Sequence, residues 1–136
     1  MTRFMMPLRD AVEFIFKAIY LAWGGEVFVP KMPAVKIIDL VEVLKKLLGL
    51  NNNIKEIGIK IGEKLYEELM TRDEERRSLE RNDMYIILPP PINGKNNKYF
   101  YPGAYIPKGN NHYTSEKGNF LSKDEIKKLL QKEKLI

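Results

Sequence analysis

The sequence predicts an α/β fold that is mainly helical, with a few short strands and no complete sheet of its own. Several stretches place apolar residues at the spacing of one helix face, and a few short stretches have the alternation or the apolar content of strands. None of the strand-like stretches is long enough to build a self-sufficient sheet. We therefore expect an incomplete, α+β-like fold whose short strands lie at the edge of a larger structure.

Composition excludes several kinds of site. The 136 residues include no cysteine and one histidine, so we expect no disulfide and no metal site. No apolar run approaches the roughly 18 residues of a membrane span, and the opening residues lack a signal peptide, which favours the cytoplasm. The net charge of +5 comes mainly from lysines in the last third of the chain. A nucleic-acid footprint would be denser and richer in arginine, so we expect no nucleic-acid partner.

The first half of the chain predicts two helices separated by a short strand. The helix over Pro7–Ala22 is apolar around most of its circumference, so we expect it to be buried on two sides. A strand over residues 26–29 follows, and two prolines fix the loop after it. The second helix, over residues 35–48, has one apolar face and ends at Gly49, a residue that suits the C′ position.

The second half predicts shorter elements. Thr71 with Glu74, and Ser122 with Glu125, have the spacing of capping boxes that begin helices. Residues 92–119 are rich in Asn, Gly, Pro and Tyr and predict a long loop that is functional, partner-bound or mobile. In chain order, the expected elements are a strand over residues 54–60, a helix over 63–70, a charged helix over 71–81, a strand over 84–88 and a final helix from Ser122.

The stretch from Ile57 to Leu69 is the candidate for a binding site. Apolar residues alternate along an expected strand, Gly62 ends it, and an acid and a lysine begin the expected helix. A strand that ends in glycine and continues into a helix start gathers backbone N–H groups where α/β proteins bind anions. The residues alone favour either an anion-binding turn or a turn with a structural role only.

Four motifs together are more specific than this stretch. They resemble, in order, the C-terminal part of the UDP-N-acetylglucosamine 4,6-dehydratases of the capsular polysaccharide synthesis group, which belong to the extended short-chain dehydrogenase/reductase superfamily. The resemblance covers nearly the whole chain. The motifs are MTRFM at residues 1–5 with the helix after it, GGEVFVPKMP at residues 24–33, GIKIGEKLYEE at residues 58–68, and Tyr113-Thr114-Ser115 through Asn119-Phe120-Leu121 with the closing helix.

The resemblance implies the substrate-binding part of an enzyme without its catalytic part. In that family an N-terminal Rossmann half holds NAD(P) and a Tyr-x-x-x-Lys catalytic pair, whereas the C-terminal part binds the nucleotide of the UDP-sugar. This sequence has no Gly-x-Gly-x-x-Gly motif and no such Tyr–Lys pair in the expected context. We therefore expect no catalytic residue and no bound cofactor in this chain, with NAD(P) implied for the complete enzyme. Residues 1–91 would form the substrate-binding core, and residues 92–136 an irregular loop and a C-terminal helix.

The same resemblance implies three ligand-binding residues. Arg3 matches an arginine that approaches the UDP pyrophosphate, and Glu63 matches an acid that accepts hydrogen bonds from the ribose hydroxyls. Lys60 stands where the family motif Arg-Pro-Gly-Glu-Lys has an arginine, so the positive charge is kept but the bidentate fork is lost. The implied partners are UDP-N-acetylglucosamine or a related UDP-sugar and the Rossmann half of the enzyme, and a homo-oligomer is left open. The identity of the hexosamine and any epimerisation at C5 stay open.

Other functions stay open beside this one. The apolar helix over Pro7–Ala22 fits a non-catalytic interaction module that docks to a Rossmann partner or associates with itself. The basic charge and the aromatic residues between Tyr99 and Tyr105 would also fit an RNA-binding domain, whose binding would depend strongly on salt. His112 and Ser115 lack a third partner for nucleophilic catalysis, so we do not predict a catalytic pair there.

Overall fold

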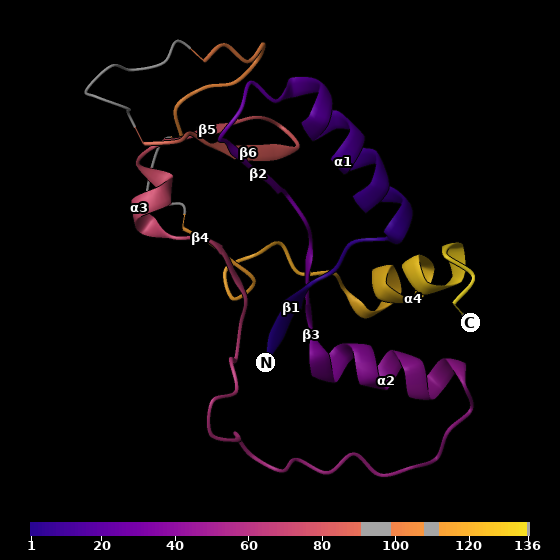
Figure 1. Ribbon diagram of the computed structural model, residues 1–136. Coiled ribbons are helices and arrows are strands. Elements are labelled where there is room, and N and C mark those ends of the chain that lie inside the picture. The colour runs from indigo at the N-terminus through magenta and orange to yellow at the C-terminus, as the bar shows by residue number, and fades with distance from the viewer. Residues whose placement is uncertain (91–98, 108–111, 136) are drawn as a thin grey trace. The chain divides into compact units, whose positions relative to one another are not determined.

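A computed structural model describes residues 1–90, 99–107 and 112–135 (Figure 1). Within these residues the short strands form small sheets of two or three strands, and none of them is a closed or extended sheet. The predicted α/β fold with short strands is confirmed. The elements are β1 (Thr2–Phe4), α1 (Leu8–Leu21), β2 (Val27–Pro30), β3 (Ala34–Lys36), α2 (Ile37–Leu47), β4 (Glu68–Met70), α3 (Arg72–Glu75), β5 (Ser78–Glu80), β6 (Met84–Ile87), β7 (Tyr113–Thr114) and α4 (Lys123–Lys132).

The chain divides into two compact units, each built from segments that are far apart in the sequence. The first unit contains residues 1–5, 32–67 and 114–136, and the second contains residues 6–31 and 68–113. The boundary predicted at residue 91 divides the chain by function and not by compactness. It therefore stays a prediction.

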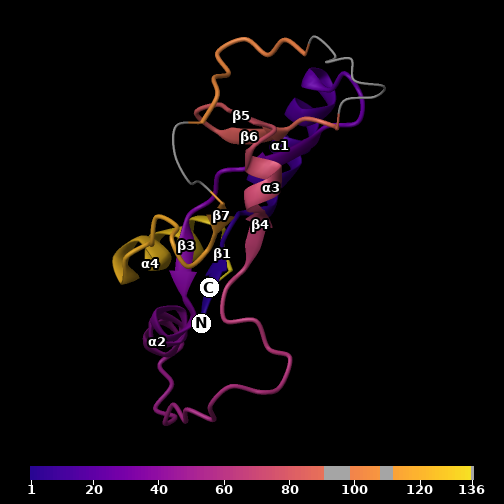
Figure 2. The same ribbon diagram turned by 90° about the vertical axis from the view of Figure 1, so that its left-hand side faces the viewer.

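In the first unit, two helices pack beside a two-stranded sheet. β1 pairs antiparallel with β3, with Thr2 opposite Lys36 and Phe4 opposite Ala34 (Figure 2). α2 and α4 meet over a shared apolar core, so the amphipathic pattern of each helix is satisfied by the other. The buried residues of this core are Val35, Val43, Ile126 and Leu130.

Local signals fix the helix ends of this unit. Ser122 caps α4: its hydroxyl accepts from the Glu125 N–H, and the Glu125 carboxylate accepts from the Ser122 N–H in return. This confirms the predicted capping box. Gly49 has a φ of 65°, and the Leu50 N–H donates to the Lys45 carbonyl at 2.9 Å, which is the closing bond of a Schellman motif. The predicted end of the second helix is therefore also confirmed.

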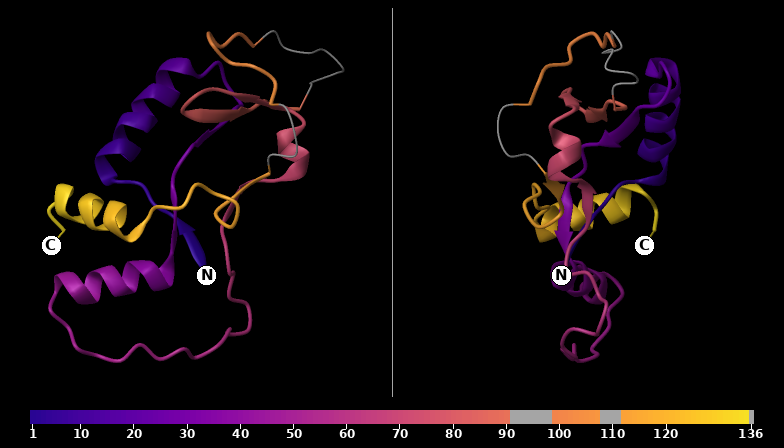
Figure 3. Two further views of the ribbon diagram at one scale, coloured as in Figure 1. Left: turned by 180° about the vertical axis from the view of Figure 1, so that it is seen from behind. Right: turned by 60° about the vertical axis from the view of Figure 1, so that its left-hand side comes forward.

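The second unit is organised around β6, the central strand of the antiparallel sheet β2–β6–β5. Alternate residues of β6 supply opposite faces, as the pleat of a strand requires. Met84 and Ile86 pack with Tyr101 on one face, where Phe14 and Leu21 of α1 also contribute. Figure 3 shows α1 alongside this sheet. The other face is lined by Val29, Met70, Tyr85 and Ile87, with Tyr113 packed against them.

α1 differs from its prediction in burial rather than in extent. Pro7 occupies the N-cap position, with a φ of −59° and a ψ of 146°, and the helix ends one residue before Ala22. The expected burial on two sides is wrong within the described residues, because only one face of the helix meets the sheet. Large apolar side chains on the remaining surface are mostly exposed: Leu8 is 81%, Phe16 68%, Ile19 67% and Tyr20 88% exposed.

Two further predictions along the second half of the chain are wrong. Residues 51–67 contain neither the expected strand over 54–60 nor a helix beginning at residue 63, and residues 68–70 form β4 instead. The predicted helix over residues 71–81 is a single turn, α3. Its Thr71–Glu74 capping box is present, but the chain then pairs with β6 as β5, so tertiary pairing overrides the local helical pattern. The expected loop over residues 92–119 lies partly outside the described residues.

Candidate functional site

Arg3 lies on β1 in the first unit, and its guanidinium is held by backbone carbonyls. Nη1 donates to the carbonyl oxygen of Thr2 at 2.7 Å, and Nη2 donates to the carbonyl oxygen of Lys64 at 2.9 Å. A guanidinium carries five N–H donors, so these two bonds orient the group and leave donors for an anion. Fraying of this N-terminal strand is restrained, because the Thr2 N–H also donates to the Leu65 carbonyl at 2.8 Å.

Lys60 and Glu63 lie on one exposed turn. The Glu63 N–H donates to the Lys60 carbonyl at 3.0 Å, and the Lys60 N–H donates to Glu63 Oε2 at 3.2 Å. Gly62 allows this turn because its φ is 82°, a value that an L side chain rarely adopts. Both predicted ligand side chains are solvent-exposed, and one oxygen of the Glu63 carboxylate has no partner within the described residues.

Ser115 anchors the segments that carry these residues, and it is completely buried. Its Oγ accepts from the Glu67 N–H at 2.9 Å and lies 3.0 Å from Thr2 Oγ1 and 3.2 Å from the Thr2 carbonyl oxygen. Its own N–H donates to the Glu67 carbonyl at 2.8 Å. Glu67 Oε2 in turn accepts from the Phe4 N–H at 2.7 Å. Hydrogen bonds therefore join β1, Glu67 and Ser115, which are far apart in the sequence.

The structure therefore brings Arg3 to the end of the turn that contains the other two predicted residues. The bond from Arg3 to the Lys64 carbonyl places the guanidinium beside the residue that follows Glu63. The proposed ligand residues lie in a common region of one unit, and whether they bind a nucleotide stays a prediction. No local pattern in the sequence indicates the Ser115 network, since each of its bonds joins distant segments.

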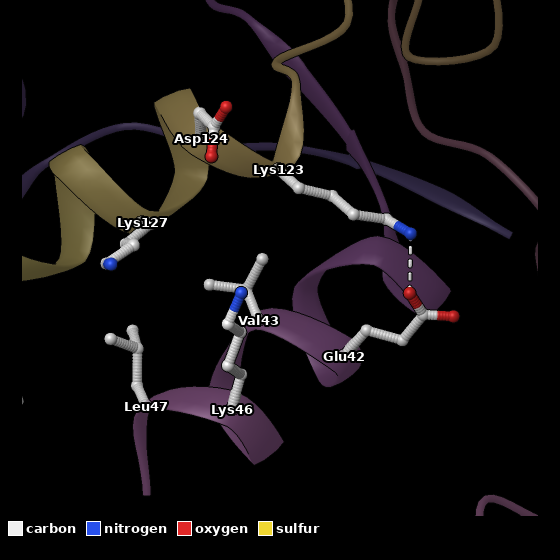
Figure 4. A pocket seen from close by; sticks show the side chains of 7 residues that line it. All are labelled: Glu42, Val43, Lys46, Leu47, Lys123, Asp124 and Lys127. Carbon is white, nitrogen blue, oxygen red and sulfur yellow. Dashed lines mark hydrogen bonds and ion pairs between the residues drawn. The ribbon is translucent and has the colours of Figure 1, made fainter.

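A pocket of about 370 Å³ lies elsewhere in the same unit, between α2 and α4 (Figure 4). Lys123 reaches from α4 to the Glu42 carboxylate of α2, and it also lies 3.5 Å from Asp39 Oδ1. The hydrogen bond to Glu42 raises the pKa of Lys123. None of the three predicted ligand residues lines this pocket. The residues that do are Glu42, Val43, Lys46, Leu47, Lys123, Asp124 and Lys127.

The described residues contain neither a metal-binding cluster nor a membrane-spanning helix. No group of three or more His, Cys, Asp or Glu side chains is placed to hold a metal ion in the part of the chain that the structure describes. In the same part of the chain, no helix has the length and apolar character needed to cross a membrane.

Comparison with known proteins identifies the family. Residues 1–89, which include Arg3, Lys60 and Glu63, match the model of a family described as polysaccharide biosynthesis protein. The chain belongs to this polysaccharide biosynthesis family. This confirms the broader part of the expected resemblance, and the fold agrees with part of an extended short-chain dehydrogenase/reductase-like protein.

Similar proteins come from both archaea and bacteria. The chain is 41% identical over 139 residues to an uncharacterized membrane protein of Methanocaldococcus jannaschii, and 35% identical over 133 residues to a UDP-glucose 4-epimerase of Rickettsia canadensis. The alignments cover 96% of this chain but 38% of each relative. The X-ray structure of Pen from Bacillus thuringiensis matches all of this chain with a TM-score of 0.82 and 39% sequence identity, over 39% of its own length. The chain thus spans about two fifths of the length of these relatives.

Proposed function

We propose that the chain is the UDP-sugar-binding part of an NAD(P)-dependent UDP-N-acetylglucosamine 4,6-dehydratase of polysaccharide biosynthesis, and that it is not catalytic alone. The observation that carries the proposal is the hydrogen bond from Arg3 to Lys64, because it aims a guanidinium at the turn of Lys60 and Glu63. The family match over residues 1–89 and the similarity to a Rickettsia UDP-glucose 4-epimerase support a sugar-nucleotide ligand.

Each residue would have a separate task in binding. The partly free guanidinium of Arg3 would contact the pyrophosphate, and the exposed Lys60 ammonium would add a flexible point charge. The free carboxylate oxygen of Glu63 would accept hydrogen bonds from the ribose hydroxyls. These contacts recognise UDP rather than the hexose, so they would serve a 4,6-dehydratase and a 4-epimerase equally.

NAD(P) would bind to the Rossmann half of the complete enzyme rather than to this chain. The sequence has no glycine-rich dinucleotide motif, and the β1–β3 and β2–β6–β5 sheets are antiparallel, unlike the parallel sheet at whose edge such a cofactor binds. When bound, the cofactor would supply hydride transfer for oxidation at C4 of the sugar and for the return of the hydride after water is eliminated across C5–C6. The residues of this chain would hold and orient the nucleotide during that sequence.

Isothermal titration calorimetry of the chain with UDP tests the proposal. We expect UDP to bind and Arg3→Ala to weaken binding about tenfold or more, because a charge-assisted phosphate contact is lost. Arg9→Ala is the matched control: Arg9 is an exposed arginine that pairs with Glu13 on α1. Equal UDP affinity of Arg3→Ala, Arg9→Ala and wild type would contradict the pyrophosphate assignment. Unchanged affinity of Glu63→Ala would contradict the ribose assignment.

A second candidate function is a non-catalytic interaction module that docks through α1 to a Rossmann-domain partner or to another copy. The exposed apolar surface of α1 favours it, since Phe16 is 68% and Ile19 67% exposed. Analytical ultracentrifugation with wild type and Phe16→Glu separates the cases for self-association: a change of mass between them supports α1 as an interface. A monomer that also fails to bind a relative's nicotinamide-binding domain would rule this function out.

A further inference from the structure

Residues 54–61 form an exposed segment whose side chains alternate as in a strand, although no strand forms there. Ile57 is 69%, Ile59 68% and Ile61 fully exposed, and all three would lie on one face of an extended chain. Within the described part of the chain, residues 54–59 make no backbone hydrogen bond. An exposed apolar segment with free N–H and C=O groups is a template for pairing with another strand.

We propose that this segment pairs antiparallel with the same segment of a second copy, about a two-fold axis at Gly58. In this register Ile57 of each copy lies opposite Ile59 of the other, so four isoleucine side chains meet at the centre of one face, and Ile61 of each copy lies opposite Lys55 of the other at its ends. On the opposite face, Glu56 of each copy lies opposite Lys60 of its partner. A segment that matches itself in both apolar pattern and charge is what a closed, isologous dimer contact requires.

The hydrogen bonds already present in the segment agree with this register. In an antiparallel pair, residues alternate between those that exchange hydrogen bonds and those whose backbone groups point away. If Ile57 and Ile59 exchange the bonds, the backbone groups of Lys60 point away from the partner. The Lys60 N–H and carbonyl are engaged in the turn with Glu63, so that turn is kept in the dimer.

The same alternation brings the charged pair close. Residues 56 and 60 form the non-hydrogen-bonded pair of the ladder, in which opposing side chains approach most closely. Gly58 has a φ of 74° and would have to become extended, which glycine does without steric cost. A Cβ placed at Gly58 meets nothing within 4 Å, so the backbone there has room to adjust.

Disulfide trapping tests the register, because the chain has no cysteine of its own. Two single variants, Glu56→Cys and Lys60→Cys, are mixed under mild oxidation. We expect them to form a mixed disulfide dimer, in which the second Glu56–Lys60 pair stays intact. Lys55→Cys mixed with Lys60→Cys is the matched control, since position 55 lies on the other face of the strand. Equal trapping in both mixtures would overturn the proposed register.

Charge reversal tests the contact without any cysteine. We expect Glu56→Lys and Lys60→Glu each to weaken dimerisation roughly tenfold in sedimentation equilibrium, because two opposite-charge pairs become two like-charge pairs. The double variant Glu56→Lys/Lys60→Glu exchanges the charges and should restore the dimer. A wild-type chain that stays monomeric at high micromolar concentration, or a double variant weaker than both single ones, would overturn the proposal.

Discussion

Two regions of the molecule use isoleucine in opposite ways. On β6, Ile86 and Ile87 are at most 1% exposed and are flanked by a paired strand on each side. In residues 54–61 of the other unit, Ile57, Ile59 and Ile61 are at least 68% exposed and have no strand beside them. The local pattern is strand-like in both. A strand-like apolar stretch therefore forms a strand only where long-range pairing partners are present, and residues 54–61 have none within the described part of the chain.

The largest effect is expected when a core side chain of β6 is shortened. Ile86→Ala should lower the free energy of unfolding by about 2–5 kcal/mol, because it removes a completely buried side chain from the centre of the sheet. Ile61→Ala should change it by less than about 0.5 kcal/mol, since that side chain is fully exposed. Urea denaturation of both variants measures the difference, and similar losses would show that residues 54–61 are packed in solution.

A second effect concerns the buried anchor of the candidate site. Ser115→Ala should lower the free energy of unfolding by about 1–3 kcal/mol, because the Glu67 N–H loses its acceptor at a completely buried position. UDP affinity should fall as well, since β1 and Arg3 are held through the same network. Thermal unfolding and UDP titration measure the two effects. Loss of stability without loss of affinity would separate the Ser115 network from the binding site.

The sequence predicted elements whose signals are local. Both capping boxes form, and α1 begins within a residue of its predicted start, because these features depend on neighbouring residues. β1 and β5 were not predicted, since each is defined by its pairing with another strand, β3 and β6 respectively. The helix predicted from residue 63 failed because Gly62 and the Lys60–Glu63 bonds close a turn that does not continue as a helix.

For the candidate site, too, the sequence predicted individual residues but not the contacts between distant segments. Arg3, Lys60 and Glu63 came from the motif resemblance, and the structure adds that Arg3 contacts the backbone next to Glu63. Ser115 belongs to one of the four resembling motifs, but the sequence suggests for its side chain only a nucleophile without a third partner. Its structural role depends on bonds to Thr2 and Glu67, which no periodicity or spacing in the sequence indicates.

An alkaline titration tests the burial of Tyr85 on β6. Burial, followed by the nearby Glu80 carboxylate, raises the pKa of Tyr85 to about 12. The folded state therefore favours the neutral phenol: its contribution to stability is complete below the unfolded pKa of about 10 and is lost as the pH rises from 10 to 12. Tyr85→Phe should remove this part of the alkaline loss, at most about 1.4 kcal/mol per pH unit. Identical pH dependence of wild type and Tyr85→Phe between pH 9 and 12 would contradict it.

The smallest effect compares the two capping boxes. Ser122→Ala and Thr71→Ala each remove one N-cap acceptor, which typically costs about 1 kcal/mol. α4 contributes Ile126 and Leu130 to a core, whereas α3 has no buried residue. Ser122→Ala should therefore lower the free energy of unfolding by the full cost of the lost cap. Thr71→Ala should lower it by only part of that cost. Hydrogen exchange of the amides of Glu125 and Glu74 measures each cap directly. An equal loss at both positions would mean that the single turn of α3 is as firmly coupled to global unfolding as a helix packed over a core.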